Sequence, residues 1–178
     1  MILFDDYTID KILKVDALGL SNLMASNAKR FQRFFPITLK QNLNLKESKL
    51  FVSKKVKEFE TNEEFLFTLK ANNSTIIGLI YIKELDWEKK QGELAYCIDV
   101  NNEGLGLITS AVKKLIEYAF NKLELERLQI IVHKDNLGSV RVAKKCNFIW
   151  QRKLLNEHTP PNEDPLDMEL YELYKTYD

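Results

Sequence analysis

The sequence predicts an α/β (α+β) protein in which a mixed, mostly antiparallel sheet has helices on both faces. Between residues 62 and 100, three strand-like segments are joined by short polar turns, a pattern typical of an antiparallel meander. The apolar period then changes to three and four residues, which indicates an amphipathic helix. Strand-like and helical segments follow to the end of the chain, and a mixed sheet covered by helices accounts for this order.

The first third of the chain is irregular. Residues 7–13 (YTIDKIL) suggest a short strand, and a helical pattern runs from Ala17 to about Ala28. After FFPI, a charged, helix-forming stretch extends from about Leu45 to Phe59. These segments predict helices that precede the main run of strands.

The meander begins after Asn62. The segment EEFLFTLK is interpreted as an alternating strand that ends at the polar turn ANNST. A long strand, Ile76–Asp86, follows, then a turn at Lys89–Gly92 and a strand at Glu93–Val100. We therefore expect three consecutive antiparallel strands.

A helix with one buried face follows the meander. Its apolar residues recur at three- and four-residue steps: Leu105, Ile108, Val112, Leu115, Ile116, Ala119 and Phe120. A short buried strand, Arg127–His133, leads to a second helix from about Asn136 to Cys146, which either Asn136 or Ser139 could cap. Closing strands are expected at 148–155 and 167–174, around the polar loop TPPNEDP.

Length and composition indicate how many domains the chain forms and which classes of partner its charge would attract. A chain of 178 residues is most simply one domain, 1–178, with room for a full hydrophobic core. Lys plus Arg and Asp plus Glu both number 26, so no net charge attracts nucleic acid or an anionic membrane. We expect neither as a partner. The sequence leaves open whether the protein is a monomer or a homodimer.

The sequence also bears on location and metal content. The segment MILFDDYTID is acidic and lacks an h-region, and no apolar run approaches the ~20 residues of a membrane span, so we expect a cytoplasmic protein. Cys97 and Cys146 lie in apolar segments and suggest buried thiols in a reducing compartment. No ligand cluster surrounds His133 or His158, so no metal site is expected.

Two glycines, Gly104 and Gly106, form an elbow in the segment DVNNEGLGLITSAV (residues 99–112). They could make a plain tight turn from strand to helix. They could also let the backbone approach a phosphate, because a helix N-terminus has unpaired amides and a partial positive charge. No Lys or Arg lies between Asp99 and Val112, so a phosphate site here would use main-chain donors.

Two familiar phosphate loops do not fit the elbow. A P-loop needs Gly-Lys-Ser/Thr, and the segment Leu107-Ile108-Thr109 has no lysine. A dinucleotide fingerprint needs a third glycine where Thr109 stands, and a parallel βαβ unit in place of a meander.

A third pattern does fit. NNEGLG followed by a helix resembles the acyl-CoA pyrophosphate loop of the GCN5-related N-acetyltransferases (GNAT superfamily). DNLGSVRVAKKCNF resembles that superfamily's next motif through Asn136, Ser139 and Phe148. The serine indicates the ribosomal-protein N-acetyltransferase (RimJ/RimL-like) branch. GELAYCIDV resembles that branch's Glu-x-Gly-Tyr strand, and LDMELYEL its Asp-x-x-x-Tyr ending.

The resemblance implies a GNAT fold with about six to seven strands, splayed between the fourth and fifth strands. It implies acetyl-CoA as cosubstrate, with its acyl-pantetheine arm paired near Ile98–Val100 and a peptide N–H near Val100 at the thioester oxygen. The implied cofactor-binding residues are Ile98, Val100, Asn101, Glu103, Gly104, Leu105, Gly106, Leu107, Ile108, Asn136, Ser139 and Lys145. Lys145, with Arg141 and Lys144, could meet the 3′-phosphate or form a solvated helix face.

The catalytic residues are harder to assign. The superfamily's tyrosine acid falls on Ala143 here, so Ser139 is the expected thiolate partner, with helix capping as the alternative. Glu93 is the candidate base, with Tyr96 near it; an exposed edge charge is the alternative. Strand alternation puts Glu93 and Tyr96 on opposite faces unless a bulge intervenes, and the resemblance implies such a bulge.

For His133 and three phenylalanines, a structural and a functional role are both possible. His133 is expected to be structural more often than catalytic. Phe31, Phe34 and Phe35 could line the acceptor pocket, with core packing as the default. The sequence departs from the family pattern at Ala95, Asn101, Ser110 and Asn147; Asn147 could still adopt the left-handed conformation of the usual glycine.

The leading hypothesis is an acyltransferase that moves an acetyl group from acetyl-CoA to a protein N-terminal α-amine or a small-molecule amine, by direct attack in a ternary complex. A version that acetylates polyamines or antibiotics would be favoured by an acidic acceptor groove. The alternatives are a non-catalytic CoA-binding or partner-binding module and a structural domain without a ligand.

Overall fold

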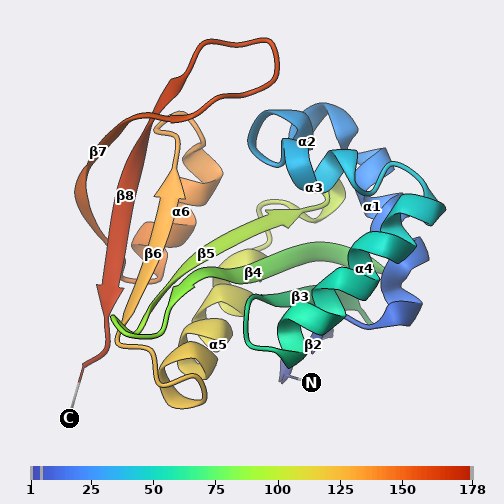
Figure 1. Ribbon diagram of the computed structural model, residues 1–178, viewed down its shortest axis with the longest axis horizontal. Coiled ribbons are helices and arrows are strands. Elements are labelled where there is room, and N and C mark those ends of the chain that lie inside the picture. The colour runs from blue at the N-terminus through green and yellow to red at the C-terminus, as the bar shows by residue number, and fades with distance from the viewer. Residues whose placement is uncertain (1, 5, 177–178) are drawn as a thin grey trace.

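The centre of the molecule is an eight-stranded sheet in the order β1-β2-β3-β4-β5-β6-β8-β7 (Figure 1). The computed structural model describes residues 2–4 and 6–176. The strands are β1 (Ile2–Phe4), β2 (Tyr7–Lys11), β3 (Phe65–Ala71), β4 (Ile76–Asp86), β5 (Gln91–Ile98), β6 (Arg127–Val132), β7 (Ile149–His158) and β8 (Leu166–Tyr174). Neighbouring strands are antiparallel except β5 and β6, which are parallel.

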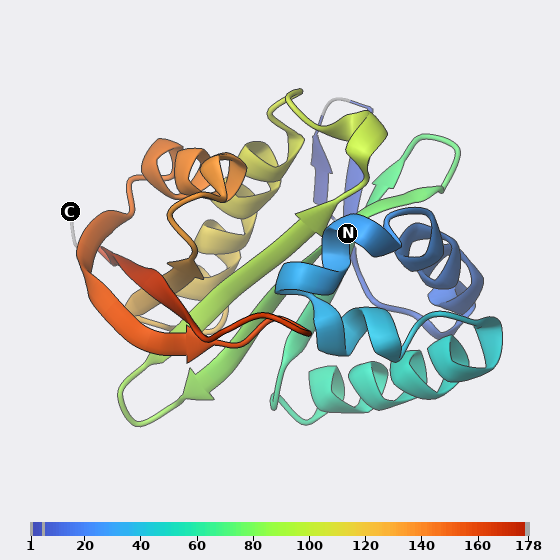
Figure 2. The same ribbon diagram turned by 90° about the horizontal axis from the view of Figure 1, so that it is seen from above.

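Helices cover both faces of this sheet, as the sequence predicts (Figures 1 and 2). The α-helices are α1 (Ala17–Ser26), α2 (Ala28–Phe34), α3 (Pro36–Lys40), α4 (Leu45–Glu60), α5 (Leu107–Asn121) and α6 (Leu137–Lys145); the short 3₁₀ turns are η1 (Lys14–Asp16) and η2 (Val100–Asn102). One core lies between the sheet and α5 and α6. A second core lies on the opposite face, under α1 and α4. No helix in the described part of the chain is long and apolar enough to cross a membrane.

The predicted meander is confirmed as β3, β4 and β5, and the predicted long strand Ile76–Asp86 is β4. The alternating character expected of β3 is wrong, because Phe65, Leu66, Phe67, Thr68 and Leu69 are all buried. Helices on both sides enclose this strand, so both of its faces are buried. The seven predicted strands are present, and β1 adds a short eighth strand beside β2.

The predicted splay between the fourth and fifth strands is confirmed as a gap between β5 and β6. These strands pair at Gln91, Gly92 and Glu93 of β5 and no further, although β5 continues to Ile98 and β6 to Val132. Beyond Glu93, one edge of β5 therefore faces the gap. Main-chain groups at that edge are free to pair with something other than β6.

Candidate active site

The glycine elbow has the geometry of an open helix start. Gly104 and Gly106 both have φ of +77°, and Gly106 is the N-cap of α5 with no side chain capping the helix. A Cβ atom added at either glycine would meet nothing within 4 Å. Glycine is therefore needed here for the left-handed backbone, and the space above the elbow is clear.

The amides of this elbow have no partner in the protein. Among the residues that the structure describes, the N–H groups of residues 104–109 donate no hydrogen bond, and the first bond of α5 runs from Ser110 N to Gly106 O at 3.0 Å. The side chains of Leu107 and Ile108 are buried in the core beneath α5, whereas Leu105 is exposed. Unpaired amides at a helix start attract an anion.

The main-chain amides of Val100, Asn101 and Glu103, just before the elbow, are already bonded within the protein. Val100 N donates to Asn27 Oδ1 at 3.0 Å, and Asn101 N donates to Asp99 Oδ1 at 3.1 Å. Asn101 Nδ2 also donates to Asp99 Oδ1 at 3.3 Å, and Glu103 N donates to Val100 O at 3.3 Å. The predicted oxyanion role of an amide near Val100 is therefore not available at Val100 itself. Within the loop before α5, the open donors begin at Gly104.

Other main-chain groups face the gap instead. Asp99 N donates to Ile77 O of the neighbouring strand at 2.7 Å, which fixes the direction of that peptide. Because peptide groups alternate along an antiparallel strand, the amides of Tyr96 and Ile98 point away from β4, toward β6. Arg30 Nη1 donates to Ile98 O at 3.3 Å from that side. The strand edge predicted to pair with an acyl arm thus exposes two amides.

Glu93 lies where β5 and β6 begin to diverge. Its carboxylate accepts an ion pair from Lys83 Nζ at 2.9 Å. Burial raises the pKa of Glu93 above the ordinary value of 4.5; Lys83 opposes this shift, and the charges of Glu84 and Glu157 add to it. The interpretation of Glu93 as an exposed edge charge is wrong, since only 14% of its side chain is exposed.

Tyr96 and Ser139 meet on the opposite face of β5. The Tyr96 hydroxyl donates to Ser139 O at 3.2 Å, and burial raises its pKa, so the phenol is a neutral donor. Tyr96 packs with the core under α5 and α6, whereas Ala95 and Cys97 pack with the other core. By alternation, Glu93 lies on the face of Ala95 and Cys97.

The predicted bulge that would bring Glu93 and Tyr96 to one face is wrong. The register of β5 with β4 is continuous from Ile98 to Glu93, and the irregularity lies between Lys83 and Asp86, nearer the hairpin. The positive φ of Glu84 takes up the extra length there. The two candidate groups therefore flank the gap from opposite sides of the sheet.

Helix α6 is capped by Asn136, not by Ser139. Asn136 Oδ1 accepts from Ser139 N at 3.2 Å, so one of the two predicted caps is confirmed. No bond of the Ser139 hydroxyl to another described residue competes with a ligand role. At the far end of the helix, Asn147 has φ of 64°, as the left-handed interpretation requires.

A family model described as an acetyltransferase (GNAT) domain matches residues 8–149. The chain belongs to the GNAT acetyltransferase family. It is 32% identical over 76 residues to the ribosomal-protein-serine acetyltransferase of Escherichia coli (strain K12), covering 43% of this chain and 42% of that protein. It is 30% identical over 80 residues to the spermidine N(1)-acetyltransferase of the same organism, covering 45% and 43%. The chain thus spans less than half the length of either relative.

A solved structure shows the same fold. RimL, a ribosomal L7/L12 α-N-protein acetyltransferase in complex with coenzyme A, superposes with a TM-score of 0.90 at 15% identity. The superposition covers 97% of this chain and 96% of that chain. The fold and the splayed gap are therefore those of the GNAT family.

The end of α6 lies beside the start of α5 in this GNAT fold. Cys146 Sγ lies 3.6 Å from Thr109 O, so the last turn of α6 contacts the first turn of α5. Lys145 is exposed next to Cys146. Lys145 therefore lies one residue along the chain from this contact with α5. Within residues 2–4 and 6–176, no group of His, Cys, Asp or Glu is arranged to hold a metal ion.

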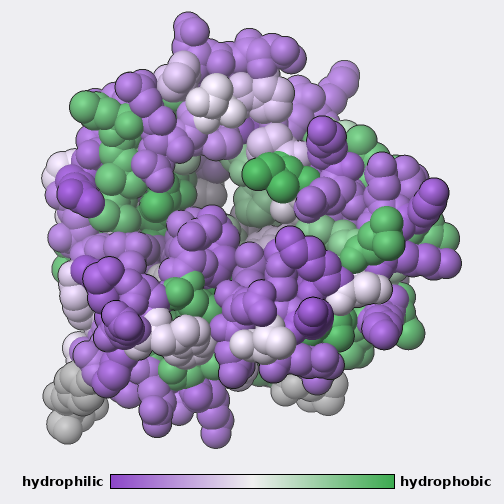
Figure 3. Space-filling view, in the orientation of Figure 1, coloured by the Kyte–Doolittle hydropathy of each residue, from purple (hydrophilic) through white to green (hydrophobic). Residues whose placement is uncertain are grey.

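Helix α2 crosses the gap between β5 and β6. Its start is tied to β5 through Asn27 and Arg30. At its other end, the Phe34 ring stacks on His133 at the end of β6, with ring centroids 6.0 Å apart, and lies 5.8 Å from the His158 ring. In the orientation of Figure 1, Figure 3 shows the surface hollowed between the helices and the β7–β8 side.

The contacts of α2 decide between the interpretations of the aromatic residues. Phe31 is buried in the core, as the default predicts, whereas Phe34 is half-buried at the gap. His133 is buried, and its Nδ1 accepts from Asp135 N at 3.3 Å, so its ring is held in place. His158 Nε2 lies 2.6 Å from Arg33 O. Sequence reasoning missed Asn27 and Arg30, because no spacing signal connects them to the elbow.

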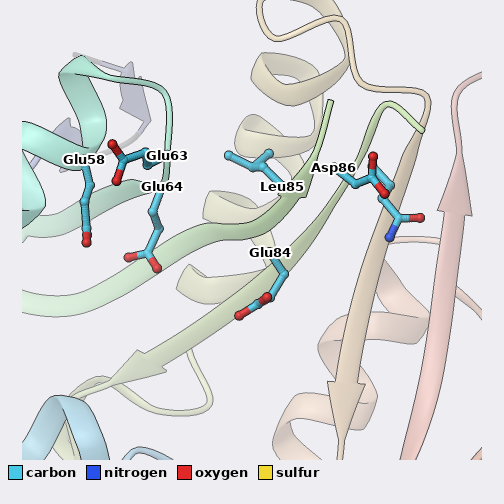
Figure 4. A pocket seen from close by; sticks show the side chains of 7 residues that line it. Glu58, Glu63, Glu64, Glu84, Leu85 and Asp86 are labelled. Carbon is cyan, nitrogen blue, oxygen red and sulfur yellow. The ribbon is translucent and has the colours of Figure 1, made fainter. Parts of the chain in front are cut away.

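An acidic pocket of about 580 Å³ opens on the sheet face that carries Glu93 (Figure 4). It is lined by Glu58, Glu63, Glu64, Glu84, Leu85, Asp86 and Gln91. Glu58 lies in the last turn of α4, Glu63 and Glu64 lie in the α4–β3 turn, and the others come from the β4–β5 hairpin. Lys55 binds Glu58 and Glu64 at 2.7 and 2.6 Å, which compensates part of the negative charge.

Proposed function

We propose that this GNAT acetyltransferase moves an acetyl group from acetyl-CoA to an amine by direct attack in a ternary complex. The observation that carries the proposal is the row of unpartnered amides at residues 104–109, beside the gap between β5 and β6. Amides in this arrangement suit the diphosphate of CoA, and the amides of Tyr96 and Ile98 suit the acyl arm. Lys145 would meet the 3′-phosphate, and Asn136 would stay a helix cap close to the arm.

The two faces of β5 divide the proposed chemistry. The ion pair with Lys83 favours the charged form of Glu93, which would take the proton from an amine that approaches on the same face of β5. As the nitrogen–carbon bond forms, the amide of Tyr96 or Ile98 would stabilise the negative charge on the thioester oxygen. When the carbon–sulfur bond breaks, the Ser139 hydroxyl or the neutral Tyr96 phenol would donate to the leaving thiolate.

The preferred acceptor is a protein N-terminal α-amine. An α-amine with a pKa of about 7.8 is roughly 14% neutral at pH 7, whereas a lysine amine with a pKa of about 10.4 is about 0.04% neutral. An α-amine therefore needs little help from a base. The single carboxylate of Glu93 would be enough as the base.

A polyamine is the second candidate acceptor. The acidic pocket at Glu84 and Gln91 lies on the face of Glu93 and favours a ligand with several positive charges. Lys55 is shared between Glu58 and Glu64, and Lys89 pairs with Asp86, so five carboxylates line a pocket in which two lysines supply these ion pairs, and a polyamine could add positive charge there. An acidic groove of this kind would favour a polyamine as the acceptor.

Calorimetric titration with acetyl-CoA tests the proposal, followed by a thiol-release assay with short peptides that have free N-termini and with spermidine. We expect saturable binding and amine-dependent release of the CoA thiol. Absence of binding to any CoA species would contradict the proposal. Binding without turnover on either class of amine would support a non-catalytic CoA-binding or partner-binding module instead.

We further propose that residues 1–178 act as one acyl-CoA N-acyltransferase domain in the cytoplasm. The buried, unpaired thiols of Cys97 and Cys146 support a reducing compartment. Both a monomer and a homodimer are compatible with a site built from one chain, and light scattering distinguishes them.

A further inference from the structure

The elbow of α5 offers hydrogen-bond donors without a full positive charge of its own. The diphosphate of CoA is an anion, and the segment from Asp99 to Val112 contains no lysine or arginine. Amides at a helix start carry only a partial charge. A cation that belongs to the site must therefore come from another part of the chain.

Arg30 of α2 supplies such a cation. Its guanidinium forms an ion pair with Glu103, the residue just before Gly104. Arg30 Nη1 also donates to Ile98 O at 3.3 Å and to Asn27 Oδ1 at 3.2 Å. These neutral acceptors fix the guanidinium at the end of β5, between the gap and the elbow.

The Glu103 carboxylate is a partner that Arg30 could readily exchange for a phosphate. The side chains of Arg30 and Glu103 are 37% and 48% exposed, and an exposed ion pair is worth little. Glu103 also directly precedes the open amides in the chain, and its negative charge would oppose an incoming diphosphate. A guanidinium binds phosphate oxygens with the same planar fork that it uses for carboxylate.

We propose that Arg30 is a diphosphate ligand of this site, and that it exchanges the carboxylate of Glu103 for the CoA diphosphate when the cofactor binds. The bonds to Ile98 O and Asn27 Oδ1 hold the guanidinium in place during the exchange. Glu103 then acts as a competitor of the cofactor for Arg30. This inference rests on the proposed function, because it requires CoA as the ligand of the elbow.

Calorimetry with three ligands tests the proposal: CoA, 3′-dephospho-CoA, which keeps the diphosphate, and pantetheine, which has no phosphate. Arg30→Gln should weaken binding of the first two by about 10- to 100-fold, the range of a charge-assisted hydrogen bond, and leave pantetheine unchanged. Glu103→Gln should strengthen CoA binding by roughly three- to tenfold. This gain in affinity should disappear in the Arg30→Gln background, because there is then no guanidinium for Glu103 and CoA to compete for.

Arg33→Gln is the matched control. Arg33 lies one turn further along α2 and forms a similar ion pair with Glu163, with side chains 40% and 39% exposed, but toward the β7–β8 loop. Its loss should leave the affinity for CoA unchanged. Thermal unfolding verifies that each variant is folded, and Arg30→Lys, which keeps the charge without the fork, should retain part of the affinity.

Several outcomes would overturn the inference. They are unchanged CoA affinity in Arg30→Gln, weaker CoA binding in Glu103→Gln, or an equal loss for pantetheine, which would show a merely structural role. In each of these cases the wild type still binds CoA, and the proposed function stands. If the wild type binds no CoA, the proposed function fails and this inference fails with it.

Discussion

The two ends of β5 lead to surfaces of opposite make-up. At its C-terminal end, the chain continues into an elbow whose open groups are main-chain amides, with two glycines and no basic side chain in the loop. At its N-terminal end, Gln91 borders a pocket of side-chain carboxylates. One surface suits an anion and the other a cation, and the gap between β5 and β6 lies between them.

This difference shows how each surface is encoded. The elbow depends on backbone conformation, which a few consecutive residues determine. It therefore keeps its open amides although Asn101 departs from the family pattern. The pocket depends on carboxylates from the end of α4, the α4–β3 turn and the β4–β5 hairpin, which only the folded protein brings together. Changes at the two ends should therefore affect different ligands.

The largest expected effect is at the carboxylate between these surfaces. Glu93→Gln should lower kcat about 100-fold and leave CoA affinity unchanged, because a positioned base is worth about that factor. Since burial raises the pKa of Glu93, the wild-type rate should fall as the pH drops through a value above 4.5, where the base becomes protonated. Steady-state kinetics against pH checks both points; a variant that keeps the rate and the acid limb would exclude Glu93 as the base.

A change at the elbow should affect the cofactor alone. Gly104→Leu should weaken CoA binding at least about 30-fold, because the side chain would project into the clear space above the amides. The left-handed backbone should cost about 1–2 kcal/mol of unfolding free energy. Calorimetry and urea unfolding measure the two effects separately. A loss of stability with intact CoA binding would mean that the elbow is only a turn.

A change at the acidic pocket should affect polyamine acceptors alone. Glu84→Gln should raise the KM for spermidine roughly three- to tenfold, and it should leave the KM for a peptide N-terminus nearly unchanged. Removal of this negative charge should also lower the pKa of Glu93, so the acid limb should move to lower pH. Glu88→Gln, in the same hairpin but outside the pocket lining, is the control. Equal changes for both acceptors would argue against a polyamine site.

The smallest effect is expected where β5 meets α6. Tyr96→Phe removes the hydroxyl that donates to Ser139 O, which should cost about 1 kcal/mol of unfolding free energy. If the phenol also assists the leaving thiolate, kcat should fall by a further several-fold at unchanged CoA affinity. Chemical unfolding and turnover distinguish the two roles. An undiminished kcat with the expected loss of stability would make the hydroxyl purely structural.

The sequence predicted most of the fold because its periodicity is local. The meander, α4, α5, α6 and the splay follow from apolar spacing and from the motif resemblance, and Asn147 adopts the predicted left-handed conformation. The buried character of β3 was missed, since periodicity cannot tell how many helices will cover a strand. The predicted bulge in β5 was misplaced, because the extra residues are taken up at Glu84 and Leu85, where the hairpin leaves room.

The site was predicted only as far as it consists of consecutive residues. The elbow glycines and the capping Asn136 could be predicted from the sequence. The contact of Asn27 with Val100 joins residues 73 apart in sequence, and the contact of Arg30 with Ile98 joins residues 68 apart. No short pattern encodes such distances, so the occupied amides and the nearby cation became visible only in the fold.

The crossing of α2 has a consequence for the shape of any acceptor. Because this helix is tied to β5 at Asn27 and to the β6–β7 side at Phe34, it limits approach to the gap from its own side. Under the proposed function, we therefore expect flexible chain ends and slender linear amines to be better acceptors than an amine on the flat surface of a folded protein.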